Sequence, residues 1–354
     1  MSKVKLAILK NELEDDHLDW IKACDNYSDQ VEYDVIDLVA QDWLEKATRK
    51  KYQFFLTKAP GRIAYYKQLY DERVYILNQV LGLPVYPTLN ELLIYENKRF
   101  LSYYLKAKNI PHPDTWVFYN KQEAKAFSET CSLPIVAKTN IGAGGSGVKI
   151  FKKREELRKY IDTAFSEKGI KRGFMPNFRK GDYLKRLMKR ISNPAKSIDY
   201  FKEKKKAATV EPQKFFVLFQ EYIQSEFEWR CVVINNSYFG HKKLRFFGEK
   251  MSGTSKVSWD VPDEELLNTL KKIVDENGFQ SQAIDLFYNK TRGYLVNELQ
   301  CFWGSKNPHQ MIMDGVPGRF VYQGGEWIFD EGSFNQNNSY DLRLQHVLEL
   351  IRNK

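Results

Sequence analysis

The sequence lacks several features that would place it in common classes of protein. No apolar run reaches the 18 residues expected of a membrane-spanning helix. The N-terminus meets Lys10 and then a group of acidic residues before a signal-peptide core is complete, so we do not expect secretion. The cysteines are widely spaced, without a C-x-x-C motif; they are Cys24, Cys131, Cys231 and Cys301. This spacing predicts reduced thiols in a cytoplasmic protein rather than a zinc site.

Several common nucleotide-binding motifs are absent as well. The chain has no G-x-x-x-x-G-K-[ST] sequence, which excludes a P-loop. It has neither H-R-D nor D-F-G, which excludes a protein kinase. Its five histidines form no group with the spacing of metal ligands.

What the chain does contain is length, apolar content and an uneven distribution of charge. Its 354 residues exceed what one hydrophobic core usually serves, and its 43% of hydrophobic residues excludes global disorder. The net charge of +10 is concentrated, because residues 149–214 hold 21 Lys and Arg against 8 Asp and Glu, while the rest of the chain holds 34 against 37. We therefore expect two or three domains, one of which carries a basic segment suited to an anionic partner.

Hydrophobic periodicity predicts that the first ninety residues form a domain of their own. Strand signals alternate with helical spacing, which indicates a small, mostly parallel α/β domain in residues 1–90. The strands are expected at residues 4–8, 33–38 and 52–56, with a helix from Leu18 and a closing loop at residues 84–88.

The remainder, residues 91–354, shows a different order of elements. A helix capped near Asn97 comes first, and mainly strands follow it, which predicts an α+β domain. Its strands are expected at residues 133–138, 148–151, 214–223, 228–234, 283–287 and 294–299, with a helix at residues 266–274. We assign a glycine-loop subdomain to about residues 111–220, including a basic insertion at residues 152–213.

A glycine-rich loop lies between two of these strands. Residues 142–147 match G-x-G-x-x-G, yet a strand and not a helix follows, which excludes the dinucleotide-binding turn. Such a strand–loop–strand flap can close its backbone N–H groups over nucleotide phosphates, and Lys138 stands where its ammonium group would reach the same phosphates. The candidate loop residues are Gly142, Gly144, Gly145, Ser146 and Gly147.

Further motifs follow at characteristic distances. Lys98 begins the helix that precedes Ile-Pro-His-Pro at residues 110–113. Gln-Glu-Tyr-Ile at residues 220–223 ends a strand, and Glu228 stands seven positions after Glu221. Late in the chain, one strand carries Asp285 and the next carries Glu298 and Gln300.

Together these motifs resemble the ATP-grasp superfamily over roughly residues 3–304, in particular the branch of D-alanine–D-alanine ligase, glutathione synthetase and the ligases that add amino acids to protein C-termini. The resemblance implies a small N-terminal pre-ATP-grasp domain followed by an ATP-grasp fold of two subdomains. It also implies that ATP phosphates are held by Lys98, Lys138 and the glycine loop, adenine by Glu221, Tyr222 and Ile223, ribose by Glu228, and one or two Mg²⁺ ions by Asp285, Glu298 and Gln300.

The chemistry of these residue types agrees with such roles. Mg²⁺ prefers carboxylate oxygens shared with nucleotide phosphates, and both carboxylates follow apolar runs where an unpaired charge would be costly. Gln300 replaces the asparagine usual in the family, and Asn297 would face away from it in a regular strand. Arg230 is expected either to stabilise the transferred phosphoryl group or to pair with Glu228. Further cations near these strands, and a loop that follows the last of them, receive no individual role from the sequence; they are Lys243, Arg245, Lys256 and residues 303–306.

The basic insertion contains one amphipathic stretch. Apolar side chains at residues 183–191 share one helical face, and lysines and arginines share the opposite face. Three interpretations stay open here: a helical lid, a surface for an anionic polymer, and a contact with anionic lipid. RNA is disfavoured because aromatic residues do not alternate with the charges.

The function predicted from these features is ATP-dependent ligation of a carboxylate to an amine through an acyl phosphate, with an anionic acceptor. Two alternatives are a small-molecule kinase of the same fold and a nucleotide-binding regulatory protein without turnover. Assembly into a homo-oligomer also stays open.

Overall fold

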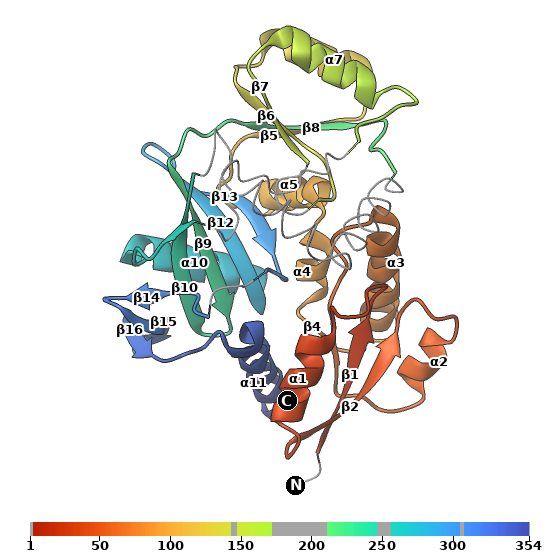
Figure 1. Ribbon diagram of the computed structural model, residues 1–354, viewed down its shortest axis with the longest axis vertical. Coiled ribbons are helices and arrows are strands. Elements are labelled where there is room, and N and C mark those ends of the chain that lie inside the picture. Colours follow the sequence, from red (N-terminus) through yellow and green to blue (C-terminus); the bar gives the residue numbers. More distant parts are fainter. Residues whose placement is uncertain (1–2, 143–146, 172–210, 246–255, 305–307, 354) are drawn as a thin grey trace, which may run out of the picture. The chain divides into compact units, whose positions relative to one another are not determined.

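The protein forms two compact units in the computed structural model, which describes residues 3–142, 147–171, 211–245, 256–304 and 308–353 (Figure 1). Unit 1 comprises Met1–Gly61, Tyr65–Pro113 and Ile223–Lys354, and unit 2 comprises Arg62–Ala64 and Asp114–Tyr222. Unit 2 overlaps the span predicted for the glycine-loop subdomain. The predicted domain boundary at residue 90 stays a prediction.

The N-terminal part of unit 1 contains a parallel sheet of strand order β2-β1-β3-β4, which confirms the predicted fold class there. The strands are β1 (Val4–Lys10), β2 (Val31–Asp37), β3 (Phe54–Leu56) and β4 (Val85–Tyr86). The helices between them are α1 (Leu18–Asn26), α2 (Trp43–Thr48), α3 (Ala64–Tyr75) and the π-helix η1 (Ile76–Val80).

Both faces of this parallel sheet are buried, because β1 has apolar residues on both of its sides. Ala7 and Leu9 pack with residues of α2 and α3, whereas Leu6 and Ile8 pack with residues of α1. That second core also contains residues of α11 (Tyr340–Arg352), which follows the short helix η2 (Gln336–Ser339) near the C-terminus (Figure 1). The last helix of the chain therefore completes the core around its first strands.

A larger, antiparallel sheet forms the rest of unit 1, with the order β13-β12-β9-β10-β15-β14 and with β11 and β16 paired to β10 and β15. Its strands are β9 (Phe227–Ile234), β10 (Ser237–Leu244), β11 (Val257–Ser258), β12 (Ser281–Asn289), β13 (Gly293–Gln300), β14 (Ile312–Met313), β15 (Val316–Gln323) and β16 (Glu326–Glu331). Helices α4 (Leu89–Ile94), α5 (Lys98–Ala107) and α10 (Glu264–Asn277) supply apolar residues to the core on this sheet.

Local signals place these helices. Asn97 caps α5 by accepting a hydrogen bond from the Phe100 amide, as the sequence predicts. Asp263 caps α10, which ends at Gly278 in the left-handed region (φ 62°). The segment expected as a closing loop instead contains β4 and a capping box in which Thr88 begins α4.

In its described residues, unit 2 contains a four-stranded antiparallel sheet and the helices α6 (Lys121–Thr130) and α7 (Arg154–Ala164). The strand order is β5-β8-β6-β7, from β5 (Thr115–Phe118), β6 (Ile135–Lys138), β7 (Val148–Phe151) and β8 (Val217–Glu221). Helices α6 and α7 share a core with the sheet that includes Phe151, Ile161 and Phe219. The antiparallel sheets of both units agree with the predicted α+β character of the later part of the chain.

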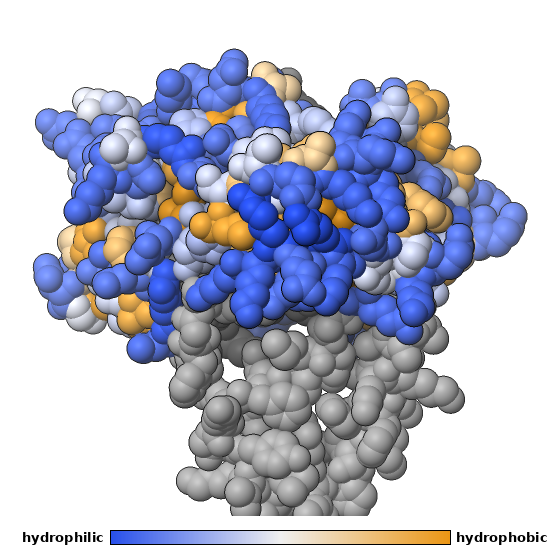
Figure 2. Space-filling model, turned by 90° about the horizontal axis from the view of Figure 1, so that it is seen from above, coloured by the Kyte–Doolittle hydropathy of each residue, from blue (hydrophilic) through white to orange (hydrophobic). Residues whose placement is uncertain are grey.

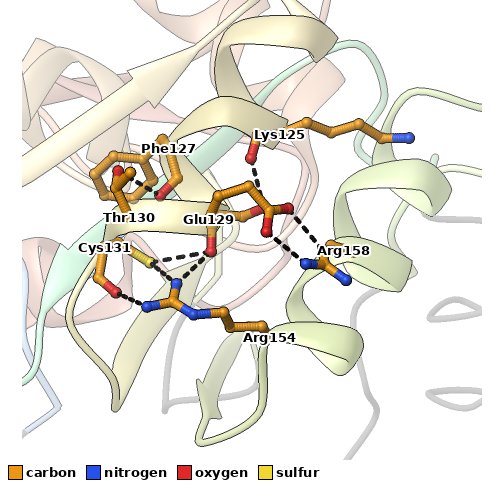
Figure 3. A network of polar contacts seen from close by, with 8 residues as sticks. Lys125, Phe127, Glu129, Thr130, Cys131, Arg154 and Arg158 are labelled. Atoms are coloured by element: carbon orange, nitrogen blue, oxygen red, sulfur yellow. Dashed lines mark hydrogen bonds and ion pairs between the residues drawn. The ribbon is translucent and has the colours of Figure 1, made fainter.

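The start of the basic segment belongs to this compact fold, because α7 joins α6 through its arginines (Figure 3). Arg154 donates hydrogen bonds to the carbonyl oxygens of Ser128, at 2.5 Å, and Cys131, at 3.0 Å. Arg158 donates to the Glu129 carboxylate, at 2.7 Å from its Nε. The amphipathic stretch predicted at residues 183–191 lies outside the described residues.

Three further features of the fold are the apolar character of its helices, the hydropathy of its surface and the state of its cysteines. Among the residues described, no helix has both the length and the apolar character needed to cross a bilayer. Figure 2 shows a face on which hydrophilic residues predominate and hydrophobic residues form small separate patches. All four cysteines are buried free thiols.

Candidate functional site

One face of the antiparallel sheet in unit 1 carries carboxylates and cations on four adjacent strands. In β12, Asp285 lies opposite Arg230 of β9 on one side and opposite Glu298 of β13 on the other. Glu228 lies two residues before Arg230 and opposite Lys243 of β10. Because residues two apart on a strand share a face, the strand register alone brings these side chains together.

Asp285 and Arg230 form the central ion pair of this face. The Nη2 atom of Arg230 is 2.8 Å from Oδ2 of Asp285, and its Nε donates to Oδ1 of the same carboxylate. This two-bond geometry is the strongest that a carboxylate and a guanidinium can form. The structure therefore pairs Arg230 with Asp285, a partner that the sequence did not suggest, and it places Lys243 beside Glu228.

Lys243 connects this pair to the neighbouring carboxylate. Its Nζ atom is 2.5 Å from Oδ2 of Asp285 and 2.5 Å from Oε2 of Glu228. The side chain is only 6% exposed, so the ammonium group depends on these two carboxylates for solvation. The sequence alone gives Lys243 no role, because it does not predict the strand β10 that positions this lysine.

Asn297 also belongs to this face, and the expectation that it would point away is wrong. Its Nδ2 atom is 2.5 Å from Oε1 of Glu228. The reason is a β-bulge, since Glu298 pairs with Asp285 and Val296 pairs with Leu286, which leaves Asn297 without an opposite residue. The extra residue breaks the two-residue alternation, which a regular strand would have kept.

Burial and charge act in opposite directions on the two central carboxyls. Burial would raise the pKa of Asp285, but the charges of Arg230 and Lys243 lower it to about 2. Burial raises the pKa of Glu228, and Lys243 offsets that only in part, while the nearby Asp285 charge adds to it. Asp285 is therefore the firmly ionised member of the pair.

Lys98, the first residue of α5, reaches the edge of the same face. Its Nζ atom is 3.7 Å from Oε1 of Glu298 and 3.4 Å from Oε2 of Glu96. Glu298 is more exposed than the other carboxylates of this face, at 25%. Gln300 lies two residues further along β13, opposite Ala283.

The donor set of this face fits a Mg²⁺ ion that is shared with phosphates. Asp285 and Glu298 offer hard carboxylate oxygens from directly opposed positions, and Gln300 offers an amide oxygen on the same strand. Within the described ranges no group of three or more His, Cys, Asp and Glu side chains could hold a metal ion alone. A site with one or two carboxylates plus nucleotide oxygens is what Mg²⁺ usually takes.

Unit 2 carries the second predicted lysine and the base of the glycine loop. Lys138 is the last residue of β6, and Val148 lies opposite it in β7. The Thr139 amide donates to the Gly147 carbonyl at 2.9 Å, which closes the base of the loop. A Cβ atom on Gly147 would lie 1.8 Å from Oγ1 of Thr139, so any other residue there would force the Thr139 side chain to move. Gly142 is also described, whereas Gly144, Gly145 and Ser146 lie outside the described residues.

The predicted adenine segment begins at the end of β8. Glu221 lies opposite Ile135 of β6, and its carboxylate accepts a hydrogen bond from the Asp114 amide at 3.2 Å. Tyr222 is the last residue of unit 2, and Ile223, at which the chain returns to unit 1, is buried.

The remaining candidates lie in unit 1. The Arg245 amide donates to the Glu226 carbonyl at 3.2 Å, and the Lys256 carbonyl accepts from the Leu244 amide at 3.0 Å. Trp303 is buried and Gly304 is exposed, while residues 305–307 lie outside the described residues.

Comparison with known proteins places the chain beside ATP-binding enzymes. Residues 100–178 match the family model of the carbamoyl-phosphate synthase L chain, ATP binding domain. The alpha-aminoadipate–LysW ligase LysX of Saccharolobus solfataricus is 26% identical over 252 residues, which span 69% of this chain and 76% of the relative.

Solved structures agree in fold. A D-alanine–D-alanine ligase from Bacillus anthracis, complexed with ATP, has a TM-score of 0.54 at 14% identity and covers 100% of this chain and 99% of its own. The N5-carboxyaminoimidazole ribonucleotide synthetase from Thermotoga maritima has a TM-score of 0.55 at 13% identity, with 98% of this chain and 76% of its own covered. At these identities the likeness concerns the fold.

Proposed function

We propose that this chain is an ATP-dependent ligase of the ATP-grasp superfamily, and that it joins a carboxylate to an amine through an acyl phosphate, with release of ADP and phosphate. The observation that carries this proposal is the alternation of charges across β10, β9, β12 and β13. Three cations, Lys243, Arg230 and Lys98, each lie within ion-pair distance of a carboxylate on that face. Such an arrangement suits a reaction that moves a highly charged phosphoryl group.

The residues that the sequence singles out would hold the nucleotide. Lys98, Lys138 and the loop at residues 142–147 would bind phosphates, and Glu221, Tyr222 and Ile223 would frame adenine. Glu228 would accept hydrogen bonds from the ribose hydroxyls. Its two oxygens already accept from Lys243 and Asn297, but a carboxylate has about four lone-pair positions, so acceptor capacity remains.

Asp285, Glu298 and Gln300 would hold one or two Mg²⁺ ions. The metal would neutralise phosphate charge and fix the geometry of the reacting oxygens. Lys98 contacts Glu298 and would shift its ammonium group from that carboxylate to a phosphate when nucleotide is bound. Asp285 holds the guanidinium of Arg230 in a fixed orientation, which preorganises its other N–H donors for the transferred phosphoryl group.

The reaction would proceed in two balanced steps. An oxygen of the substrate carboxylate attacks the γ-phosphorus of ATP, and ADP leaves with the bridging oxygen. The amine then attacks the acyl carbon, loses a proton, and expels inorganic phosphate. Arg230 of β9 and Lys243 of β10 both contact Asp285 at the centre of this face. Negative charge would develop there during the reaction, and these two cations would stabilise it.

The acceptor would be anionic. Most of the surplus basic charge falls in residues 172–210, which hold 12 Lys and Arg against 3 Asp and Glu. A segment of that composition attracts anionic substrates, and an anionic polymer or lipid surface would be attracted in the same way.

The test is to measure ADP and free phosphate separately while carboxylates and amines are supplied alone and in pairs. The proposal expects both products in equal amounts, and only when carboxylate and amine are present together. A kinase would release ADP without phosphate once a hydroxyl acceptor is supplied. If no combination of carboxylate and amine led to ADP formation, the ligase proposal would be contradicted.

Two variants sharpen this test. Glu298→Ala is expected to abolish turnover while ATP affinity changes little, because a metal ligand is lost but the lysines and adenine contacts remain. Glu326→Ala removes an exposed carboxylate from the β16 strand and serves as the matched control.

A further inference from the structure

A second cationic group in unit 1, which we call the Lys58–Arg343 cluster, lies where β13 leaves the sheet. It contains Lys58, Phe302, Trp303, Tyr340 and Arg343. Phe302 and Trp303 follow the end of β13, Tyr340 and Arg343 belong to the first turn of α11, and Lys58 follows β3. These residues have no role in the mechanism described above.

Arg343 is a buried cation that packs against aromatic rings. The residue is only 2% exposed. Its guanidinium carbon lies 4.1 Å from the centre of the Trp303 ring and 4.7 Å from that of the Tyr340 ring. In the part of the chain that the structure describes, no Asp or Glu forms an ion pair with it. A hydrogen bond runs from its Nη2 atom to the Cys301 carbonyl, at 3.0 Å. A buried charge usually has a partner of opposite sign, because the rings alone do not replace lost hydration.

Among the residues that the structure describes, three buried hydrogen-bond groups of this cluster have no partner. They are Nε of Arg343, Nε1 of Trp303 and the Tyr340 hydroxyl. Two of them can only donate, and the hydroxyl can donate too. Buried donors are nearly always paired, so three orphans on mutually packed residues indicate that an acceptor is taken from outside the chain.

Lys58 adds a second positive charge beside the same rings. Its Nζ atom lies 4.9 Å from the centre of the Phe302 ring and 5.7 Å from that of Tyr340. Its backbone is fixed, since its amide donates to the Tyr70 hydroxyl at 2.8 Å and its carbonyl accepts from the Asn11 side chain at 2.8 Å. Unlike Arg343, Lys58 is partly exposed, which gives an incoming group access to the cluster.

We propose that the Lys58–Arg343 cluster binds a carboxylate of the substrate that takes no part in the reaction, so that the enzyme acts on an acidic compound with at least two carboxylates or on an amino acid through its own carboxylate. This inference rests on the proposed function, because it takes the bound carboxylate to be part of a ligase substrate. Trp303 stands only three residues after Gln300 along the chain, so the cluster follows directly on the strand that carries the proposed metal ligands. A carboxylate supplies acceptor oxygens and the negative charge that both cations lack.

The direct test is calorimetric titration of glutarate, a dicarboxylate, and glutaramide, its neutral analogue, into the nucleotide-free protein. We expect saturable binding of glutarate and none of glutaramide. Arg343→Met and Lys58→Met should each weaken glutarate binding by about tenfold or more, because each removes a charge-assisted contact. Arg352→Met, on the exposed end of the same helix, and Lys46→Met, at an exposed ion pair, serve as controls and should bind as the parent protein does.

Two outcomes would overturn the inference. One is glutarate binding that is unchanged in both variants. The other is binding of inorganic phosphate in place of glutarate with loss in the same variants, which would assign the cluster to phosphate groups. If Arg343→Met fails to fold by circular dichroism, Arg343→Lys and Lys58→Met decide, because the first retains the charge and the second alters a partly exposed side chain. No turnover is involved, so a failed ligase assay with intact glutarate binding would leave this inference standing.

Discussion

Arg230 and Asp285 lie directly opposite each other on β9 and β12 and share two hydrogen bonds, with Nη2 and Oδ2 at 2.8 Å. Lys243 contacts the same carboxylate. The Asp285 side chain is only 4% exposed, so these cations replace most of its hydration. The pair is therefore both a structural element of the sheet and the centre of the proposed site.

Removing the guanidinium should expose this dependence. We expect Arg230→Met to lower the free energy of unfolding by about 3 kcal/mol, since it leaves a buried carboxylate with one cation fewer. Urea unfolding followed by tryptophan fluorescence measures the change. Lys272→Met, which removes an ammonium group that is 72% exposed, should cost less than about 0.5 kcal/mol. Equal effects of the two substitutions would show that the ion pair does not stabilise the sheet.

A buried histidine predicts how stability depends on pH. Burial lowers the pKa of His346 to about 4, although a hydrogen bond with the Gln280 backbone acts in the other direction. The neutral ring is therefore favoured in the folded protein, while the unfolded chain titrates near pH 6.5. Its contribution is complete above pH 6.5 and is lost as the pH falls towards 4.

The corresponding experiment compares the parent protein with His346→Asn, whose amide can still meet the Tyr86 hydroxyl that now lies 3.3 Å from Nδ1. Between pH 7 and pH 5 the parent should lose about 2 kcal/mol more of its free energy of unfolding than the variant. Urea titrations at both pH values provide the difference. Parallel losses in the two proteins would contradict the lowered pKa.

The base of the glycine loop predicts a pair of compensating substitutions. Gly147→Ala should destabilise unit 2 by about 1–3 kcal/mol and weaken ATP binding, because its Cβ would lie 1.8 Å from Oγ1 of Thr139. Adding Thr139→Ala removes that hydroxyl and should recover part of both losses. Thermal unfolding and ATP titration of the single and double variants measure this, and strictly additive effects would rule out the steric explanation.

The arginines of α7 should differ in what they contribute to unit 2. Arg154 is partly buried and donates to two carbonyl oxygens at the end of α6, so Arg154→Ala should cost about 1–3 kcal/mol (Figure 3). Arg158 pairs with Glu129 at an exposed site, and Arg158→Ala should cost less than about 1 kcal/mol. Denaturant unfolding of both variants distinguishes them. A larger loss for Arg158→Ala would contradict this ranking.

The sequence predicted the sheets well wherever hydrophobic periodicity was strong. The parallel order around β1, the helix capped by Asn97 and the strands that carry Asp285 and Glu298 all have buried apolar runs or capping residues as signals. For the C-terminal helix α11, the sequence contains no signal that predicts where the helix packs. One of its partners, Trp20, lies more than three hundred residues from Tyr340 in sequence, and a long-range contact of this kind has no local signature.

The site shows the same limit. Residue types and spacing singled out Asp285, Glu298 and Arg230, but the partner of Arg230 depends on which strand lies beside β9. Asn297 was misjudged because the two-residue alternation holds only for regular strands, and a bulge shifts it by one residue. Lys243 could have been found had β10 been recognised as the next strand of a hairpin, because the register then places it opposite Glu228.

The measurement that tests the central claim most directly follows oxygen from the carboxylate substrate into phosphate. A substrate carboxylate labelled with ¹⁸O is incubated with the protein, Mg-ATP and an amine, and the inorganic phosphate is analysed by mass spectrometry. Ligation through an acyl phosphate predicts one ¹⁸O atom in each phosphate released, since the attacking carboxylate oxygen stays on phosphorus. Amide formation with unlabelled phosphate would contradict the proposed mechanism.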